Sequence, residues 1–364
     1  MEYAIIVGAL LLAFNNGAND NFKGFATVWG SNTLSYRQAL TLATIATALG
    51  GLVSLLLAQA LVQQFSGKGL VPNEVAQAPE FILSVCVGAA VTVMLATRLG
   101  FPVSTTHALI GGLVGAGLAQ SADNLQLEAL ANNFLLPLLV SPLLAAVLGL
   151  GVYRVLRLRS KAKDCVCVEA PSEEAMPNGG GLATMTKATM PSVIVADDAT
   201  CNRREVPIVR LSISKTMDRV HTLSAASICF ARGVNDTPKL TALLLAAHML
   251  GTESSVFSVV VAMVIGGLLF SRRVAETMSK KMARLDENSG LAANLITATL
   301  VLFASKFGLP VSTTHVSVGS IAGVGAGSHA VDWRTVRNIL LSWVATLPLA
   351  AAVAWWVGRA VSAG

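Results

Sequence analysis

The chain carries little charge for its size. Asp, Glu, Lys and Arg make up 13% of its 364 residues and aromatic residues another 5%, whereas 54% of the residues are hydrophobic. Soluble domains carry about 25% charged residues. This shortage of charge, with a mean hydropathy of +0.65, excludes an ordinary soluble globular protein, because too few charged side chains remain to cover its surface.

Cysteine is also scarce, and its spacing predicts no disulfide framework. Cys86 and Cys229 lie in apolar runs, so we expect them to be buried as small hydrophobic side chains. Cys165, Cys167 and Cys201 have no fourth ligand at the spacing of a zinc site, and they are predicted to be free thiols. The sequence therefore predicts no cofactor.

In place of charge the chain has long apolar runs, at 39–62, 81–97, 134–153, 256–270, 289–304 and 339–357. A run of this length can cross a hydrocarbon core about 30 Å thick. The runs predict an all-α polytopic membrane protein, which we place in the cell membrane and expect in a bacterial inner membrane.

Charge is concentrated in the middle of the chain. Residues 157–220 contain ten Lys and Arg and eight Asp and Glu, together with the stretch PSEEAMPNGGG (171–181). This composition predicts a largely disordered linker between two membrane halves, 1–156 and 221–364. Basic residues at both ends of the linker favour a cytoplasmic position, and the net charge of +6 indicates topology rather than nucleic-acid binding.

The two halves repeat each other. GANDNFKGFA (17–26) returns 216 residues later as GVNDTPKLTA (233–242), and the element PVSTTH occurs at 102–107 and, 208 residues later, at 310–315. Matches in the same order predict an internal duplication.

Charged loops indicate how the repeats are oriented. The loop 63–80 contains one Lys, whereas its counterpart 271–290 contains five Lys and Arg. Since basic short loops stay cytoplasmic, the loops are expected on opposite sides and the repeats are predicted to be inverted. Each half then crosses five times, or three times with a re-entrant hairpin formed by 81–98 and 102–119. Inverted repeats with interrupted helices are typical of secondary transporters.

Each half has an Asn-Asp pair where a membrane helix would favour leucine, at Asn19-Asp20 and at Asn235-Asp236. An Asp in the hydrocarbon costs about 2.5–3.5 kcal/mol, so two at matching places indicate a site, with Asn16 in a supporting role. The preceding Gly17 and Gly233 allow backbone breaks there, and a broken helix has free carbonyl and N–H groups that suit a cation and an anion respectively.

The PVSTTH elements are predicted to start helices, with Pro at the first helical position. Their hydroxyls and first-turn N–H groups form donor nests suited to a tetrahedral oxyanion, from Ser104, Thr105, Thr106, Ser312, Thr313 and Thr314. His107 and His315 either orient the nests or carry protons. The glycines that follow fall at small-xxx-small spacing and predict close helix packing.

These motifs resemble those of the inorganic phosphate transporter family, which contains sodium- or proton-coupled phosphate permeases and also sulfate permeases. GANDNFKG (17–24) and GVNDTPKL (233–240) match one family motif, and the two PVSTTH elements match another. The resemblance implies inverted repeats, a homodimer, an anion between the STTH hairpins and coupling cations, Na⁺ or H⁺, at the Asn-Asp motifs. Carried over, Na⁺ would lie at Asp20 and Asp236.

The chain departs from the family pattern at Lys23 and Lys239, where the family usually has Asn three residues after the motif Asp. Residues three apart share a helix face, so each Lys is expected to pair with its own Asp. Three interpretations stay open: the ammonium replaces a bound cation, contacts the anion, or serves as a structural partner.

The sequence favours import of inorganic phosphate, with a sulfate permease as the alternative. An intramembrane hydrolase using Ser104, His107 and Asp20 is disfavoured, because the whole set is duplicated and a hydrolase needs one nucleophile. An anion channel is disfavoured because channels rarely need matched carboxylates at the midplane. We therefore expect a transporter and not an enzyme.

Overall fold

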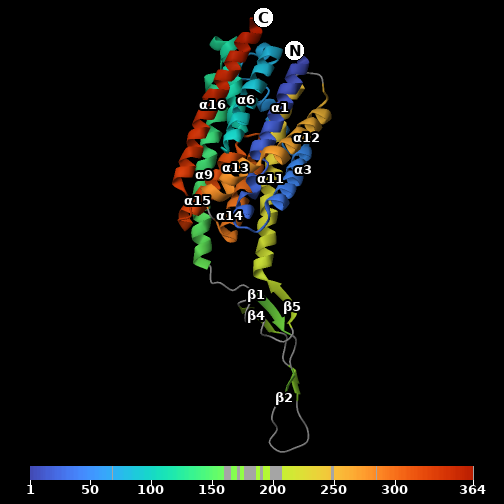
Figure 1. Ribbon diagram of the computed structural model, residues 1–364, viewed down its shortest axis with the longest axis vertical. Helices are drawn as coiled ribbons and strands as arrows, with labels where there is room; N and C mark the ends of the chain where they lie inside the picture. The colour runs from blue at the N-terminus through green and yellow to red at the C-terminus, as the bar shows by residue number, and fades with distance from the viewer. Residues whose placement is uncertain are drawn as a thin grey trace, which may run out of the picture. The chain divides into compact units, whose positions relative to one another are not determined.

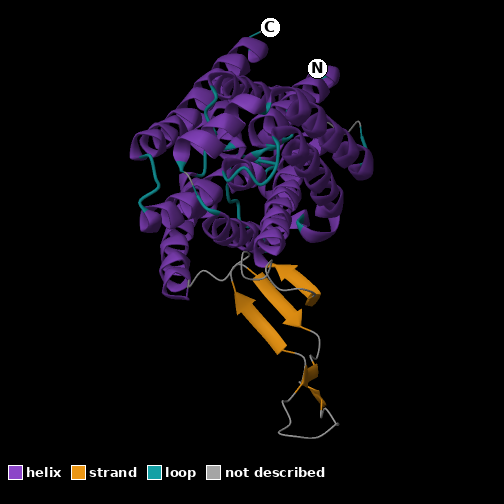
Figure 2. Cartoon of the chain, turned by 60° about the horizontal axis from the view of Figure 1, so that its bottom comes forward, coloured by secondary structure: helices purple, strands orange, loops and turns teal. Residues whose placement is uncertain are grey.

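The computed structural model describes residues 1–67, 69–159, 165–169, 173–175, 186–188, 192–196, 207–246, 250–283 and 285–363. It divides into two units: Met1–Val155 with His221–Gly364, and Leu156–Val220. Most of the chain is helical (Figure 2). The helices are α1 (Glu2–Asp20), α2 (Ala26–Gly30), α3 (Tyr36–Leu57), α4 (Gln59–Gln64), α5 (Asn73–Ala76), α6 (Pro79–Leu99), α7 (Thr105–Gln120), α8 (Leu127–Ala129), α9 (Leu136–Arg159), α11 (Ile213–Ala246), α12 (Thr252–Phe270), α13 (Arg272–Glu276), α14 (Glu287–Lys306), α15 (Thr313–Ser328) and α16 (Trp333–Ser362).

Six helices in the described part of the chain are long and apolar enough to cross a membrane: Tyr36–Leu57, Pro79–Leu99, Leu127–Val155, Thr252–Phe270, Glu287–Lys306 and Trp333–Ser362. Each contains most or all of one predicted apolar run, so the prediction of a multi-pass, all-α membrane protein is confirmed. Large apolar side chains such as Leu56 and Val344 are exposed on these helices, as expected of surfaces that contact lipid. Cys86 and Cys229 are buried free thiols, as predicted.

The two sequence halves interlock. Helix α1 of the first half packs against α12 of the second (Figure 1), and α16 of the second packs against α6 and α7 of the first. The crossings are close because glycine lines them. A Cβ on Gly17 would lie 1.9 Å from the carbonyl oxygen of Met263, and one on Gly233 would lie 2.3 Å from that of Thr47.

The glycines of the Asn-Asp motifs therefore serve packing, and the break that Gly233 allows is absent from α11. Helix α11 runs without interruption through Gly233 and Pro238, whereas α1 ends at Asp20, three residues beyond Gly17. A glycine allows a break but does not require one, and here the neighbouring backbone needs its missing side chain. Pro238 is tolerated inside α11, as prolines are in membrane helices whose neighbours satisfy the freed carbonyl.

Each PVSTTH element follows a sharp turn between two helices. Gly100 ends α6 at φ 78°, and Gly308 follows α14 at φ 68°. Ser104 and Ser312 are the N-caps of α7 and α15, so Pro102 and Pro310 lie two residues before the cap rather than at the first helical position. The helix starts were predicted correctly and the role of proline was not.

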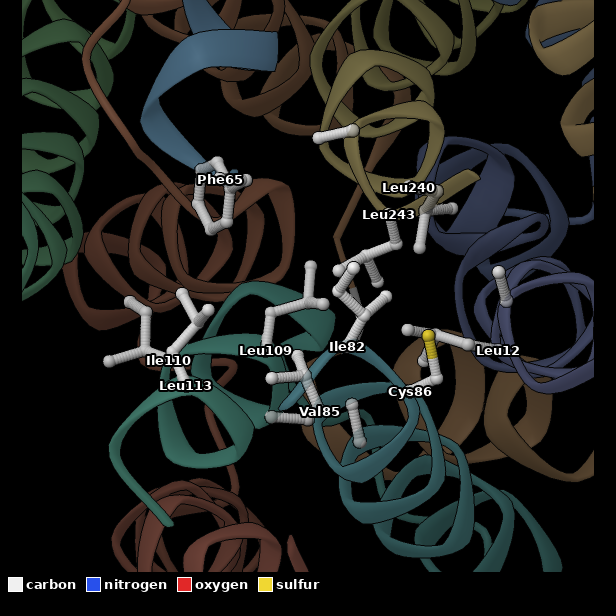
Figure 3. Close-up of a cluster of buried hydrophobic side chains, with 14 of the residues drawn as sticks. Leu12, Phe65, Ile82, Val85, Cys86, Leu109, Ile110, Leu113, Leu240 and Leu243 are labelled. Carbon is white, nitrogen blue, oxygen red and sulfur yellow. The ribbon is translucent and has the colours of Figure 1, made fainter. Parts of the chain in front are cut away.

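The largest buried apolar cluster in the described part of the chain contains side chains from both halves, including Leu12, Phe65, Val85, Leu109 and Leu240 (Figure 3). It packs α1, α6 and α7 against the second half of α11, which fixes the helix termini that carry the polar motifs.

Within the unit Leu156–Val220, the described residues form five short strands: β1 (Cys165–Glu169), β2 (Glu173–Ala175), β3 (Thr186–Ala188), β4 (Ser192–Ala196) and β5 (Pro207–Ser212). β1 pairs antiparallel with β4 and with β5, and β2 pairs with β3. The sequence predicts a largely disordered cytoplasmic linker here, which stays a prediction. Cys201 and the side chains of Cys165 and Cys167 lie outside what the structure describes.

Candidate anion and cation site

Five charged side chains are buried in the described part of the chain, and all belong to one site: Asp20, Lys23, Arg232, Asp236 and Lys239. Each is at most 4% exposed. With every group charged, three basic and two acidic side chains leave one unit of positive charge. An excess of buried charge is costly unless an opposite charge balances it, so the site favours an anion.

Lys23 links the two halves. Its Nζ donates to Asn19 Oδ1 at 2.9 Å, to the Val103 carbonyl at 2.8 Å and to Thr314 Oγ1 at 2.6 Å, and it pairs with Asp20 Oδ1. Thr314 belongs to the second PVSTTH element, so an ammonium of the first half is bound by a hydroxyl of the second.

Lys239 makes the reciprocal contacts. Its Nζ donates to Thr106 Oγ1 at 2.9 Å and to the Val311 carbonyl at 2.8 Å, and it lies 3.6 Å from Asp236 Oδ1. Thr106 in turn belongs to the first PVSTTH element. The pairing of each Lys with its own Asp, expected from the spacing, is present in both halves.

The asparagines hold the hairpin turns against the motifs. Asn19 Nδ2 donates to Thr97 Oγ1 at 2.9 Å and to the Phe101 carbonyl at 3.0 Å, and its Oδ1 accepts the Val103 N–H at 3.1 Å. Asn235 Oδ1 accepts from Ser305 Oγ at 3.1 Å, and its Nδ2 donates to the Val311 carbonyl at 3.3 Å. In each half, the motif asparagine thus holds the backbone just before the helix that begins in PVSTTH, α7 or α15.

Arg232 was not among the residues predicted for the site. Its Nη2 donates to Asn16 Oδ1 at 2.8 Å, and its Nε lies 3.6 Å from Asp236 Oδ2. Asn16 Nδ2 reaches Thr105 Oγ1 at 2.9 Å and Asp236 Oδ2 at 3.2 Å. The signal was present in the sequence, because Arg232 lies 216 residues after Asn16, at the offset of the two Asn-Asp motifs.

The N-termini of α7 and α15 offer free donors. Ser104 and Ser312 accept the N–H groups of His107 and His315 with their hydroxyl oxygens, as N-caps do. In the described part of the chain no acceptor is found for the backbone N–H groups of Thr105, Thr106, Thr313 and Thr314, all of them buried residues. The space beside the start of α7, lined by Asn16, Thr105, Thr106, Leu109, Asp236, Lys239 and Leu240, is too small to admit a water molecule.

The two histidines meet where the PVSTTH elements approach each other. The His107 and His315 rings lie 4.5 Å apart between centroids, and His315 stacks on Trp343 at 3.8 Å. Trp343 Nε1 donates to the Pro102 carbonyl at 3.0 Å. The aromatic stack therefore ties α16 to the turn before α7, which sequence reasoning did not anticipate.

The residues named for a hydrolase are not connected as a triad. Ser104 Oγ bonds the backbone of His107 and not its ring, and Asp20 pairs with Lys23. In the described residues, moreover, no group of three or more His, Cys, Asp or Glu could hold a metal ion.

The fold and the site define a multi-pass membrane protein with a duplicated, charge-lined polar centre. The family model of the Phosphate transporter family matches residues 16–354, and the chain belongs to that family.

Individual relatives agree with this membership. The chain is 26% identical over 420 residues to inorganic phosphate transporter 2-1, chloroplastic, of Arabidopsis thaliana, covering 97% of this chain and 71% of the plant protein. It is 27% identical over 390 residues to a Thermococcus kodakarensis protein provisionally named a phosphate permease, covering 96% of this chain and 94% of that protein. A solved structure of a sodium-dependent phosphate transporter has the same fold, with a TM-score of 0.78 and 20% identity over 100% of this chain and 99% of that one.

Proposed function

We propose that this protein is a secondary active transporter that imports inorganic phosphate by alternating access, coupled to Na⁺ or H⁺. The observation that carries the proposal is the four N–H groups at the starts of α7 and α15 that have no acceptor among the described residues, beside a buried site with three basic and two acidic side chains. Helix N-termini bind anions, and a tetrahedral oxyanion has enough acceptor atoms for several donors. Family membership favours phosphate, and the comparisons give no support to the sulfate alternative.

Both halves would hold the anion. Its ligands would come from Ser104, Thr105, Thr106, Ser312, Thr313 and Thr314, mainly through first-turn N–H groups, because the Thr106 and Thr314 hydroxyls already bind Lys239 and Lys23. The Asn-Asp motifs would respond to the coupling ion, since their carboxylates contact these hydroxyls or the lysines that bind them. Thr105 Oγ1 lies 3.3 Å from Asp20 Oδ2, for example.

The reciprocal contacts between halves support a rocking mechanism. Each lysine binds an oxygen of the opposite PVSTTH element, so motion of one half against the other would open one set of contacts. The proposal also includes inverted repeats, re-entrant PVSTTH hairpins and a homodimer. It places the protein in a bacterial inner membrane, with the linker in the cytoplasm.

Uptake of labelled phosphate into proteoliposomes tests the site. Asp20→Asn and Asp236→Asn should each lower the rate by about tenfold or more, because loss of a buried carboxylate leaves its basic partners unbalanced. Asp123→Asn, at an exposed aspartate, is the matched control and should behave as wild type. Wild-type rates in either site variant would remove that carboxylate from the mechanism.

Counterflow distinguishes the alternatives. Preloaded phosphate should drive transient accumulation of labelled phosphate, which a channel does not support. Sulfate counterflow faster than phosphate counterflow would contradict the assigned substrate.

A further inference from the structure

We propose that the ammonium groups of Lys23 and Lys239 are tethered cations that fill the places where a Na⁺-coupled carrier would hold its ions, so that transport here does not require Na⁺. This inference rests on the proposed function and narrows its coupling ion.

The surroundings of Lys23 are those of a hard cation. Its Nζ is surrounded by oxygens of four kinds: the Asn19 amide, the Asp20 carboxylate, the Val103 carbonyl and the Thr314 hydroxyl. Carboxylate, carbonyl and amide oxygens are the ligands that hard metal cations take from proteins. The Thr314 hydroxyl donates its own proton to the Val103 carbonyl at 3.0 Å, which turns its lone pairs toward the ammonium.

The surroundings of Lys239 repeat three of the four oxygens around Lys23, whereas the Asn235 amide oxygen accepts a hydrogen bond from Ser305 instead. Thr106, Val311 and Asp236 supply the hydroxyl, carbonyl and carboxylate oxygens, and each is the counterpart, in the other half, of an oxygen ligand of Lys23. A single buried lysine could be a local structural partner. Two lysines at the offset of the duplication, each joining its own half to the other, indicate a common role in the mechanism.

A sodium ion does not fit beside these groups. It would have to take oxygens that already bind an ammonium, and Lys23 and Lys239 are 2% and 1% exposed, so neither can turn its charge to water. Two unit charges 4 Å apart repel by about 4 kcal/mol at an effective dielectric constant of 20. With its three basic and two acidic side chains charged, the site has one positive charge in excess without any added cation, which a monovalent phosphate would neutralise.

Na⁺ binding can be tested without transport. The purified protein is melted in NaCl, KCl and choline chloride at equal ionic strength. Wild type should show equal Tm values, because a ligand that does not bind the native state does not stabilise it. Lys23→Asn with Lys239→Asn removes both ammonium groups and should gain a Na⁺-specific rise of several degrees. Lys306→Asn, at an exposed lysine, is the matched control.

The second measurement is phosphate uptake by the same proteins in the same salts. Wild-type rates should be equal in Na⁺ and K⁺, and the double variant should become stimulated by Na⁺ about fivefold or more, the scale of a typical coupling between two sites. Single variants provide the comparison if the double variant does not fold.

The outcomes are distinct. A Na⁺-specific rise in the wild-type Tm, or Na⁺ stimulation of wild-type uptake, would overturn the inference. Absence of Na⁺ binding by folded lysine variants would overturn it as well, because the oxygens would then not form cation shells. If wild type carries no phosphate in any salt or pH gradient, the proposed function fails, and the melting experiment still decides whether the lysines occupy cation sites.

Discussion

Arg232 determines the charge balance of the buried site. It is 1% exposed and contacts Asn16, Asn21 and Thr47 as well as Asp236. Without it the charges of the two lysines and two carboxylates would cancel, and the proposed phosphate site would have no positive charge in excess. We therefore expect both stability and phosphate uptake to depend on this residue.

We expect Arg232→Met to destabilise the protein by about 3–5 kcal/mol, the usual cost of removing one partner of a buried ion pair. Thermal melting in detergent measures this as a lower Tm, and phosphate uptake should be lost. Arg272→Met is the control, because that side chain is 73% exposed and its pair with Glu276 lies at the surface. A wild-type Tm in Arg232→Met would show that the guanidinium is not balancing Asp236.

At the level of helices, glycine sets the separation between the halves. A Cβ on Gly115 of α7 would lie 2.0 Å from the Ala351 carbonyl oxygen of α16, and one on Gly323 of α15 would lie 2.1 Å from the Ala146 carbonyl oxygen of α9. The small-xxx-small spacing seen in the sequence thus allows α7 to pack closely on α16 and α15 to pack closely on α9. Both partner helices contain a proline.

We expect Gly115→Ala to lower Tm and uptake together, since the carbonyl it would meet is backbone and cannot rotate away. Gly151→Ala is the matched helical control: no atom lies within 4 Å of its added Cβ, and Ala is favoured over Gly in a helix by about 1 kcal/mol. Equal Tm values for the two variants would show that α7 and α16 are not in tight contact.

The helices were largely predictable from sequence and their partners were not. Apolar runs located the six candidate spans, and serine followed by hydroxyl residues located the starts of α7 and α15. Gly17 and Gly233 misled because a glycine permits both a break and a close crossing, and only the tertiary neighbour decides between them. The aromatic contact between His315 and Trp343 is likewise a product of packing between distant segments.

For the whole molecule, the orientation of the two halves is a prediction from loop charge. The loop 271–290 is expected in the cytoplasm, and 63–80 on the opposite side. In a cysteine-free background, an impermeant maleimide added to intact cells should label Asn73→Cys directly and Asn288→Cys only after permeabilisation. Both residues are exposed. Labelling of both from one side would contradict the inverted arrangement.

The sequence could predict most of the charged residues that form the site, but not which residues they contact. The repeat identified Asp20, Asp236 and the lysines, because charge in an apolar helix is costly and its duplication is informative. It could not show that each lysine binds the opposite PVSTTH element, since the distance in sequence from Lys23 to Thr314 carries no information about their contact.

Asn16 and Arg232 occupy equivalent places in the two copies and hydrogen-bond to each other. A residue that meets its own counterpart lies where one copy of the repeat faces the other. In a dimer of identical single repeats, arginine at this place would face arginine, and two buried guanidinium groups would repel each other. In one chain with two different copies that restriction is absent, because only one copy carries the arginine. A buried arginine at this place is therefore compatible with two different copies in one chain and not with two identical ones.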